Sequence, residues 1–215
     1  MVEIYDIDRY YERSHPLIRW VESRRLAALV ELAQARAGER LLEVGCGGGH
    51  VLEQFPGLDR TGVDLSAGML KRARRRVGPS VRLIQSQAER LPFQSGSFDV
   101  VVCTEVLEHI LNPPEVIREL MRVAKPGGRV IVSIPCEANI DRAKRLLRRI
   151  PGLRRLLHTL ADDGNEWHLL EFNLERLRDV AVLAGAEVIR LRGVPVPIAP
   201  IRYVASLAPA PNDGS

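Results

Sequence analysis

The sequence has few cysteines, few aromatic residues and no long apolar run. Three cysteines, Cys46, Cys103 and Cys136, lie far apart in 215 residues, and none belongs to a Cys-x-x-Cys pair. Such a sparse and odd set argues against a disulfide framework and against a zinc site, so we expect three small buried residues in a reducing compartment. No stretch approaches the roughly 20 apolar residues of a membrane-spanning helix.

Secretion signals, internal repeats and low-complexity linkers are also lacking. Residues 1–13 are acidic and aromatic, unlike a signal peptide, and the expected location is the cytoplasm. The formal net charge of +4 permits an acidic partner without establishing one. Arginines cluster at 72–76 and 142–155, but aromatic residues make up only 5% of the chain. Because base stacking needs aromatic side chains, nucleic acid is not a favoured partner.

What the sequence does contain is an alternation of short apolar runs and helical repeats. Strands are predicted at 40–46, 60–65, 81–85, 98–104, 129–134, 187–192 and 202–207. Helices are predicted at 15–36, 50–55, 66–77, 112–123 and 173–184. Ser66 and Asn112 are the expected N-caps of two of them. The alternation indicates an α/β fold in which helices cover both faces of a mostly parallel sheet.

A glycine-rich loop at 45–49 follows the first predicted strand. Ligands of doubly wound sheets bind outside the carboxyl ends of the strands, where glycines let the backbone approach closely. Gly45 and Gly47 fit the Gly-x-Gly-x-x-Gly pattern of dinucleotide enzymes, but His50 stands at the third glycine position. Asp64, at the end of the second strand, can accept hydrogen bonds from both hydroxyls of a ribose. The loop therefore predicts a site for a nucleotide-like ligand.

Five motifs follow one another at suitable intervals. They are EVGCGGG at 43–49, GVDLS at 62–66, QAERLPF at 87–93, FDVV at 98–101 leading to EVLEHI at 105–110, and KPGG at 125–128. Together they resemble the class I S-adenosylmethionine (SAM)-dependent methyltransferases, and most closely the type 11 subgroup that includes quinone-ring methyltransferases. The resemblance implies a Rossmann-like sheet of seven strands, one of them antiparallel near the C-terminus. It also implies SAM as the cofactor and a small molecule as the methyl acceptor.

The resemblance further implies a role for individual residues. Glu43 would hold the glycine loop or meet the methionine ammonium through water, and Asp64 would bind the ribose. Ala88 and Glu89 would meet the adenine edge, although Gln87 stands where the family often has Asp. The complete implied cofactor-binding set is Glu43, Gly45, Cys46, Gly47, Asp64, Leu65, Met69, Ala88, Glu89, Thr104 and Glu105. No metal ligand set is implied.

Two histidines are the candidates on the acceptor side of the site. SAM is already activated, so the protein mainly orients and desolvates the reactants, and a base is needed only if the acceptor must lose a proton. The resemblance places His109 and His168 near the acceptor, for contact or proton removal, with Trp167 as a pocket wall. The alternatives are a structural histidine at 109 and a packed rim aromatic at 167.

The expected domain organisation is one methyltransferase domain over residues 1–208 with a flexible tail at 209–215. Residues 1–36 would form an N-terminal flap and helix, and the basic, amphipathic insert at 137–172 would cover the acceptor pocket as a lid. Such a lid suits an apolar or anionic acceptor. Its outer face is either solvated, which is the favoured alternative, or rests on a membrane surface.

Two rival functions remain at the level of the sequence. A nicotinamide-dependent oxidoreductase would also use a glycine loop and an acid such as Asp64, but His50 and the motifs at 87–93 and 105–110 disfavour it. A non-catalytic module that binds SAM or nucleic acid is the second rival. The prediction is methyl transfer from SAM to a small molecule, with oxygen, carbon and nitrogen all open as the receiving atom.

Overall fold

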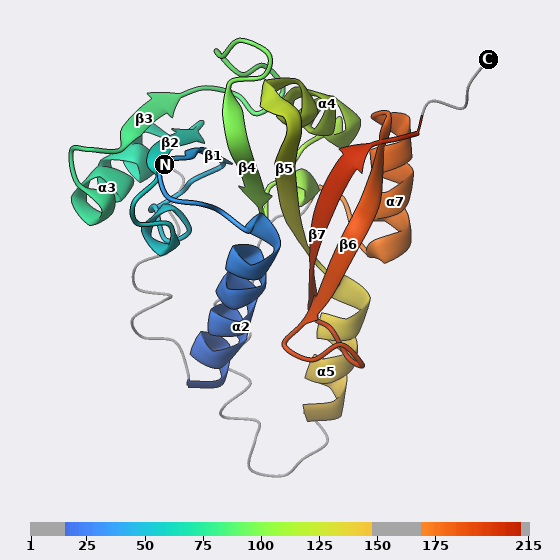
Figure 1. Ribbon diagram of the computed structural model, residues 1–215. Coiled ribbons are helices and arrows are strands. Elements are labelled where there is room, and N and C mark those ends of the chain that lie inside the picture. The colour runs from blue at the N-terminus through green and yellow to red at the C-terminus, as the bar shows by residue number, and fades with distance from the viewer. Residues whose placement is uncertain (1–15, 148–168, 212–215) are drawn as a thin grey trace.

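The computed structural model describes residues 16–147 and 169–211 of the chain. Its seven strands form one sheet in the order β3-β2-β1-β4-β5-β7-β6 (Figure 1). The strands are β1 (Arg40–Val44), β2 (Asp59–Asp64), β3 (Arg82–Gln85), β4 (Phe98–Thr104), β5 (Ala124–Pro135), β6 (Ala186–Val194) and β7 (Arg202–Pro209). β7 runs antiparallel to both of its neighbours, and the other pairs are parallel. The predicted α/β sheet with a single antiparallel strand is therefore confirmed.

Helices cover both faces of the sheet, as the alternating sequence predicts. They are α2 (Pro16–Ala33), α3 (Ala67–Val77), α4 (Pro113–Val123), α5 (Glu137–Leu147) and α7 (Leu174–Leu183), with two 3₁₀ turns, η1 (Leu52–Gln54) and η2 (Leu107–His109). One core packs α4 and α7 against the sheet, and the other packs α2, η1 and part of α3. Figure 1 shows α5 continuing beyond the carboxyl end of β5, away from the sheet.

Side-chain alternation along the central strands creates these two cores. On β4, Val101 and Cys103 face the core with α4, whereas Val100 and Val102 face the core with α2. All four side chains are fully buried. A strand that is buried on both faces must be apolar at every position, which explains the continuous apolar run in the sequence. Cys46, Cys103 and Cys136 are buried free thiols, as expected.

Two local predictions need correction. The helix expected at 50–55 is only the 3₁₀ turn η1, because the segment is one turn long and Pro56-Gly57 prevents its continuation.

Ser66 caps α3 as predicted, with its hydroxyl accepting from the Met69 N–H. Asn112 precedes α4 but makes no such bond, because its amide donates to the Glu115 carboxylate instead.

Neither a membrane-spanning helix nor a metal-binding cluster is found in the part of the chain that the structure describes. Within residues 16–147 and 169–211, no helix is both long and apolar enough to cross a membrane. The same residues contain no cluster of three His, Cys, Asp or Glu side chains suited to a metal ion.

Candidate functional site

The candidate site lies where the carboxyl ends of β1, β2 and β4 meet. β1 occupies the centre, with β2 on one side and β4 on the other, so the chain reverses its direction of winding between β1 and β4. Such a switch point leaves a crevice outside the strand ends, and ligands of doubly wound sheets bind there. The three predicted motifs at 43–49, 62–66 and 105–110 all begin in or just after these strands.

The glycine loop turns sharply away from the end of β1. The N–H groups of Gly45 and Cys46 both donate to the Val63 carbonyl oxygen, at 2.8 and 2.9 Å. Gly45 has a φ of 73°, and a Cβ atom there would stand 2.2 Å from Cγ2 of Val106. This position therefore requires glycine for its backbone conformation and also for lack of space.

Asp64 connects the glycine loop to the end of β2. Its Oδ2 accepts from the Gly47 N–H and its Oδ1 from the Ser66 N–H, both at 2.8 Å. Leu65 follows with a side chain that is 65% exposed, which is unusual for leucine. Met69, one turn into α3, is partly buried. The end of β2 thus offers a fixed carboxylate beside an open apolar surface.

Glu43 is a buried carboxyl group directly beneath the loop. Its Oε2 accepts from the Leu52 N–H at 3.1 Å, which ties β1 to η1 on the far side of the loop. Burial raises the pKa of Glu43 well above its usual range, against the opposing effects of the Leu52 hydrogen bond and the Arg25 charge. The Cys46 side chain points into the core with α2, so only its backbone faces the loop.

The segment after β3 closes the site beside Asp64. The Ser86 N–H donates to the Asp64 carbonyl oxygen at 3.2 Å, and the Gln85 side-chain amide donates to the Leu65 carbonyl oxygen at 2.9 Å. Ala88 and Glu89, which follow, are both partly buried. The structure therefore brings the second and third predicted motifs together.

Glu105 occupies a strained position at the end of β4. Its φ of 52° lies in the left-handed region, which residues other than glycine rarely adopt. Oε1 accepts from the Ser133 hydroxyl at 2.7 Å and Oε2 from Arg202 Nε at 2.8 Å. Burial alone would raise the pKa of Glu105, but the charges of Arg202 and Arg25 and these hydrogen bonds hold it below its usual value. The adjacent Thr104 is buried.

Sequence reasoning missed the charged residues that surround Glu105. Arg202 also pairs with Glu22 at 3.1 Å, and Glu22 pairs with Arg25 at 2.9 Å. Glu22 and Arg25 are each 4% exposed and belong to α2. Their spacing offered a signal, because positions 22, 25, 29 and 32 share one helical face and the last two are core leucines. Charges that continue an apolar stripe indicate a buried ionic contact.

The acceptor-side candidates are only partly described. His109 is exposed at the end of η2, close in the chain to Glu105. The neighbouring Glu108 is buried, and its carbonyl oxygen accepts from the N–H groups of Leu169 and Leu170 at 2.9 and 3.1 Å. His168 and Trp167 lie outside the described residues, as do residues 1–15 of the expected N-terminal flap and helix.

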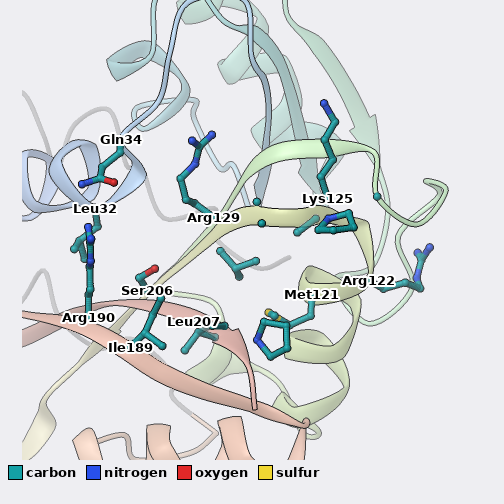
Figure 2. A pocket seen from close by; sticks show the side chains of 18 of the residues that line it. Leu32, Gln34, Met121, Arg122, Lys125, Arg129, Ile189, Arg190, Ser206 and Leu207 are labelled. Carbon is teal, nitrogen blue, oxygen red and sulfur yellow. The ribbon is translucent and has the colours of Figure 1, made fainter. Parts of the chain in front are cut away.

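A pocket of about 790 Å³ lies at the opposite, amino edge of the sheet (Figure 2). It is lined by residues 125–128 at the start of β5, the end of α4 and parts of β6 and β7. Three of its cations are engaged in ion pairs, Arg122 with Glu119, Lys125 with Asp99, and Arg129 with Glu39. None of the predicted cofactor residues lines it. The candidate site is therefore the crevice at the carboxyl edge.

Comparison with known proteins identifies the family of the chain. A family model for a methyltransferase domain matches residues 42–132. The ubiquinone biosynthesis O-methyltransferase of Thiobacillus denitrificans is 34% identical over 184 residues, covering 82% of this chain and 73% of that protein. The demethylmenaquinone methyltransferase of Renibacterium salmoninarum is 34% identical over 131 residues, covering 60% of this chain and 55% of that protein.

The fold comparison extends over nearly the whole chain. The structure of a SAM-dependent methyltransferase from Aquifex aeolicus matches with a TM-score of 0.66 and 16% identity, covering 95% of this chain and 98% of that one. This likeness shows a shared fold. Several of the curated relatives match over only about half of their own length.

Proposed function

The chain belongs to the class I SAM-dependent methyltransferases, and from this premise we propose that it methylates a small aromatic acceptor of the quinone-precursor type. The observation that carries the proposal is the 34% identity to a ubiquinone biosynthesis O-methyltransferase over 82% of this chain. The rival nicotinamide and non-catalytic functions have no such support. We favour a phenolic hydroxyl as the receiving group, because that relative is an O-methyltransferase.

The residues of the crevice fit SAM in its chemistry. Asp64 is fixed by two backbone N–H groups and presents a carboxylate for the ribose hydroxyls. The exposed Leu65 side chain, with Met69, offers an apolar surface for the adenine ring. Gln85 and Ser86 tie the end of β3 to the end of β2, and Ala88 and Glu89, which follow, can meet the edge of that ring. Glu43 braces the loop beneath the methionine part.

In the proposed reaction the protein must position two reactants and accept one proton. Bound SAM supplies an electrophilic methyl group on a sulfonium centre. Transfer of that methyl group to a phenolic oxygen would break the carbon–sulfur bond and release the phenolic proton, so a base would have to take this proton. His109, exposed on η2 beyond Glu105, is the described residue that we assign to contact the acceptor or take this proton. His168 stays a sequence prediction for the same role.

We also propose that the insert at 137–172 covers the acceptor, within a single domain that spans residues 1–208. Support comes from α5, which extends beyond the carboxyl end of β5 on the same side as the crevice (Figure 1). Residues 148–168 lie outside the described part of the chain. A lid at this edge would exclude water from the reacting groups.

Replacing Asp64 tests the cofactor site. We expect Asp64→Ala to raise the Kd for SAM by about 100-fold, because each charge-assisted hydrogen bond contributes about 1.5–3 kcal/mol. Titration calorimetry measures the Kd directly. The matched control is Asp99→Ala at the amino edge of the sheet, which should leave the Kd unchanged. Equal affinities of wild type and Asp64→Ala would overturn the ribose assignment.

The acceptor class has its own test. The wild-type protein is incubated with methyl-labelled SAM and a catechol that carries an isoprenoid chain, and the product is identified by mass spectrometry. A labelled methoxy group is the expected result, and a C-methyl product would replace our choice of receiving atom. Binding of SAM without transfer to any phenol in the assay would count against the acceptor class alone.

A further inference from the structure

Four charged side chains form a buried chain of alternating sign behind the cofactor crevice. The order is Arg25, Glu22, Arg202 and Glu105, with contacts of 2.9, 3.1 and 2.8 Å between successive members. Their side chains are between 5% and 20% exposed. The Ser133 hydroxyl completes the chain by donating to the remaining oxygen of Glu105. These residues come from α2, β7, β5 and the end of β4.

Arg202 connects the two halves of this buried ionic network. Its Nε binds Glu105 and its Nη1 pairs with Glu22, so one guanidinium holds both α2 and the end of β4. An arginine fork suits this bridging role because its donors are rigid and point in fixed directions. Removing it would leave two carboxylates buried without that charge, which proteins tolerate poorly.

Glu105 gives the network its link to the cofactor. Its left-handed backbone conformation turns the polypeptide from the end of β4 towards η2. A strained conformation persists only where the surroundings fix it, and such positions cluster at functional sites. Here the carboxylate is fixed by Ser133 and Arg202 together. We therefore expect the backbone of Glu105 to face the crevice, while its side chain anchors that backbone in the left-handed conformation.

We propose that Arg202 is a positioning residue for the SAM site, which locks the left-handed turn at Glu105 and secures α2 against the same edge of the sheet. The proposal rests on the proposed function, because it assumes that SAM occupies the crevice beside Glu105. Arg202 does not itself belong to any of the five methyltransferase motifs. Its contribution is to hold the site in its binding conformation before the cofactor arrives.

The chain supplies a matched control for this role. Arg192 on β6 pairs with Glu31 on α2, so it also joins the N-terminal helix to the C-terminal strands. That pair is about half exposed and shares no residue with the buried ionic network. Arg192→Met should therefore remove an equivalent connection without disturbing the crevice.

The main experiment compares Arg202→Met with Arg192→Met, by calorimetry with SAM and by steady-state kinetics well below the melting temperature. We expect Arg202→Met to raise the Kd and KM for SAM about tenfold while kcat changes by less than about twofold, because ground-state binding is what is lost. Arg192→Met should match the wild type in all three. Arg202→Lys, which keeps the charge without the fork, should recover part of the affinity.

Ser133→Ala provides a milder variant in case Arg202→Met does not fold. It removes one donor to Glu105 and leaves both arginines, so we expect a rise in Kd of about threefold with little change in melting temperature. If folded Arg202→Met and Ser133→Ala both bind SAM as the wild type does, the positioning role is wrong, although the proposed function stands. If the wild type itself does not bind SAM, the proposed function fails instead.

Discussion

The two edges of the sheet carry similar residues in different settings. At the carboxyl edge, Glu22, Arg25 and Arg202 are almost fully buried, and Gly45 has no room for a side chain. At the amino edge, the ion pair of Lys125 with Asp99 is 41% and 22% exposed, and Gly127 faces open space. The open edge has the 790 Å³ pocket and the KPGG motif at 125–128, yet the glycine loop, Asp64 and Glu105 lie at the crowded edge. Buried polar groups that are engaged in hydrogen bonds and ion pairs therefore indicate this site better than the volume of a cavity does.

The amino-edge pocket has a structural origin. β5 begins at Ala124, and its register against β4 shifts between Phe98 and Val100, so residues 124–128 form an irregular extension of the strand. The pocket lies between this extension and the ends of β6 and β7 (Figure 2). Arg122, Lys125 and Arg129, three of its four cations, are paired within the protein with Glu119, Asp99 and Glu39. The pocket thus accompanies the irregularity of β5, and none of the predicted cofactor residues lines it.

The largest expected contrast between the edges concerns two glycines with the same φ of 73°, Gly45 and Gly127. Alanine at either position meets the cost of a left-handed backbone, about 1–2 kcal/mol. At Gly45 it also overlaps Val106, which adds about 1–3 kcal/mol. Chemical denaturation should show Gly127→Ala losing about 1 kcal/mol of unfolding free energy and Gly45→Ala losing about 3 kcal/mol.

A second substitution separates the two costs at Gly45. Val106→Ala removes the overlapping methyl group, so the double variant Gly45→Ala/Val106→Ala should recover the contact part of the loss but not the backbone part. SAM affinity should fall with Gly45→Ala and stay constant with Gly127→Ala. Equal losses of stability at the two glycines would show that the contact with Val106 does not change the free energy of unfolding.

The next contrast is in the sign of the pH dependence. Because burial raises the pKa of Glu43, the wild type loses stability as pH rises from the unfolded pKa through the higher folded one. Glutamine keeps the acceptor for the Leu52 N–H without titrating. We therefore expect Glu43→Gln to gain melting temperature relative to the wild type as pH increases over this window.

Glu119 at the amino edge should behave in the opposite way. The Arg122 side chain and the Leu91 N–H hold the pKa of Glu119 below its usual value, against burial. The stability that it contributes is present above the unfolded pKa and is lost as pH falls through the folded one. Glu119→Gln should thus lose melting temperature relative to the wild type as pH rises. Parallel slopes for the two variants would remove the distinction.

Much of the fold could be predicted from the sequence because its signals are local. The bounds of β4 agree with the prediction, and Ser66 and Asn173 cap their helices, because apolar runs and capping residues act over a few positions. The helix predicted at 50–55 is wrong for a similar reason, since an apolar pattern of six residues cannot guarantee more than one turn. Motif order predicts a site at the carboxyl edge, because parallel strands end at the same edge of the sheet.

The spacing of Glu22 and Arg25 on α2 indicates a buried ionic contact, but the pairing of Arg202 with Glu105 could not be predicted, because it is non-local. Arg202 is separated from Glu105 by 97 residues, and nothing in either neighbourhood indicates the pairing. Register decides it: β7 pairs antiparallel with β5 so that Arg202 lies opposite Pro135, two residues beyond Ser133. Antiparallel placement of β7 thus brings its first residue to the edge where parallel strands end. Only the folded sheet shows that a residue of the C-terminal strand reaches Glu105.

The smallest expected effect is at the exposed pair of Lys125 and Asp99. Lys125→Met should cost less than about 1 kcal/mol, or up to about 3 °C in melting temperature, because a half-exposed pair is screened by solvent. Asp99 keeps the Arg40 N–H as a donor at 2.9 Å. A double-mutant cycle with Asp99→Asn measures the coupling, which should shrink further at high salt. A coupling as large as that of Arg202 with Glu105, measured in the same way, would mean that burial does not separate the two edges.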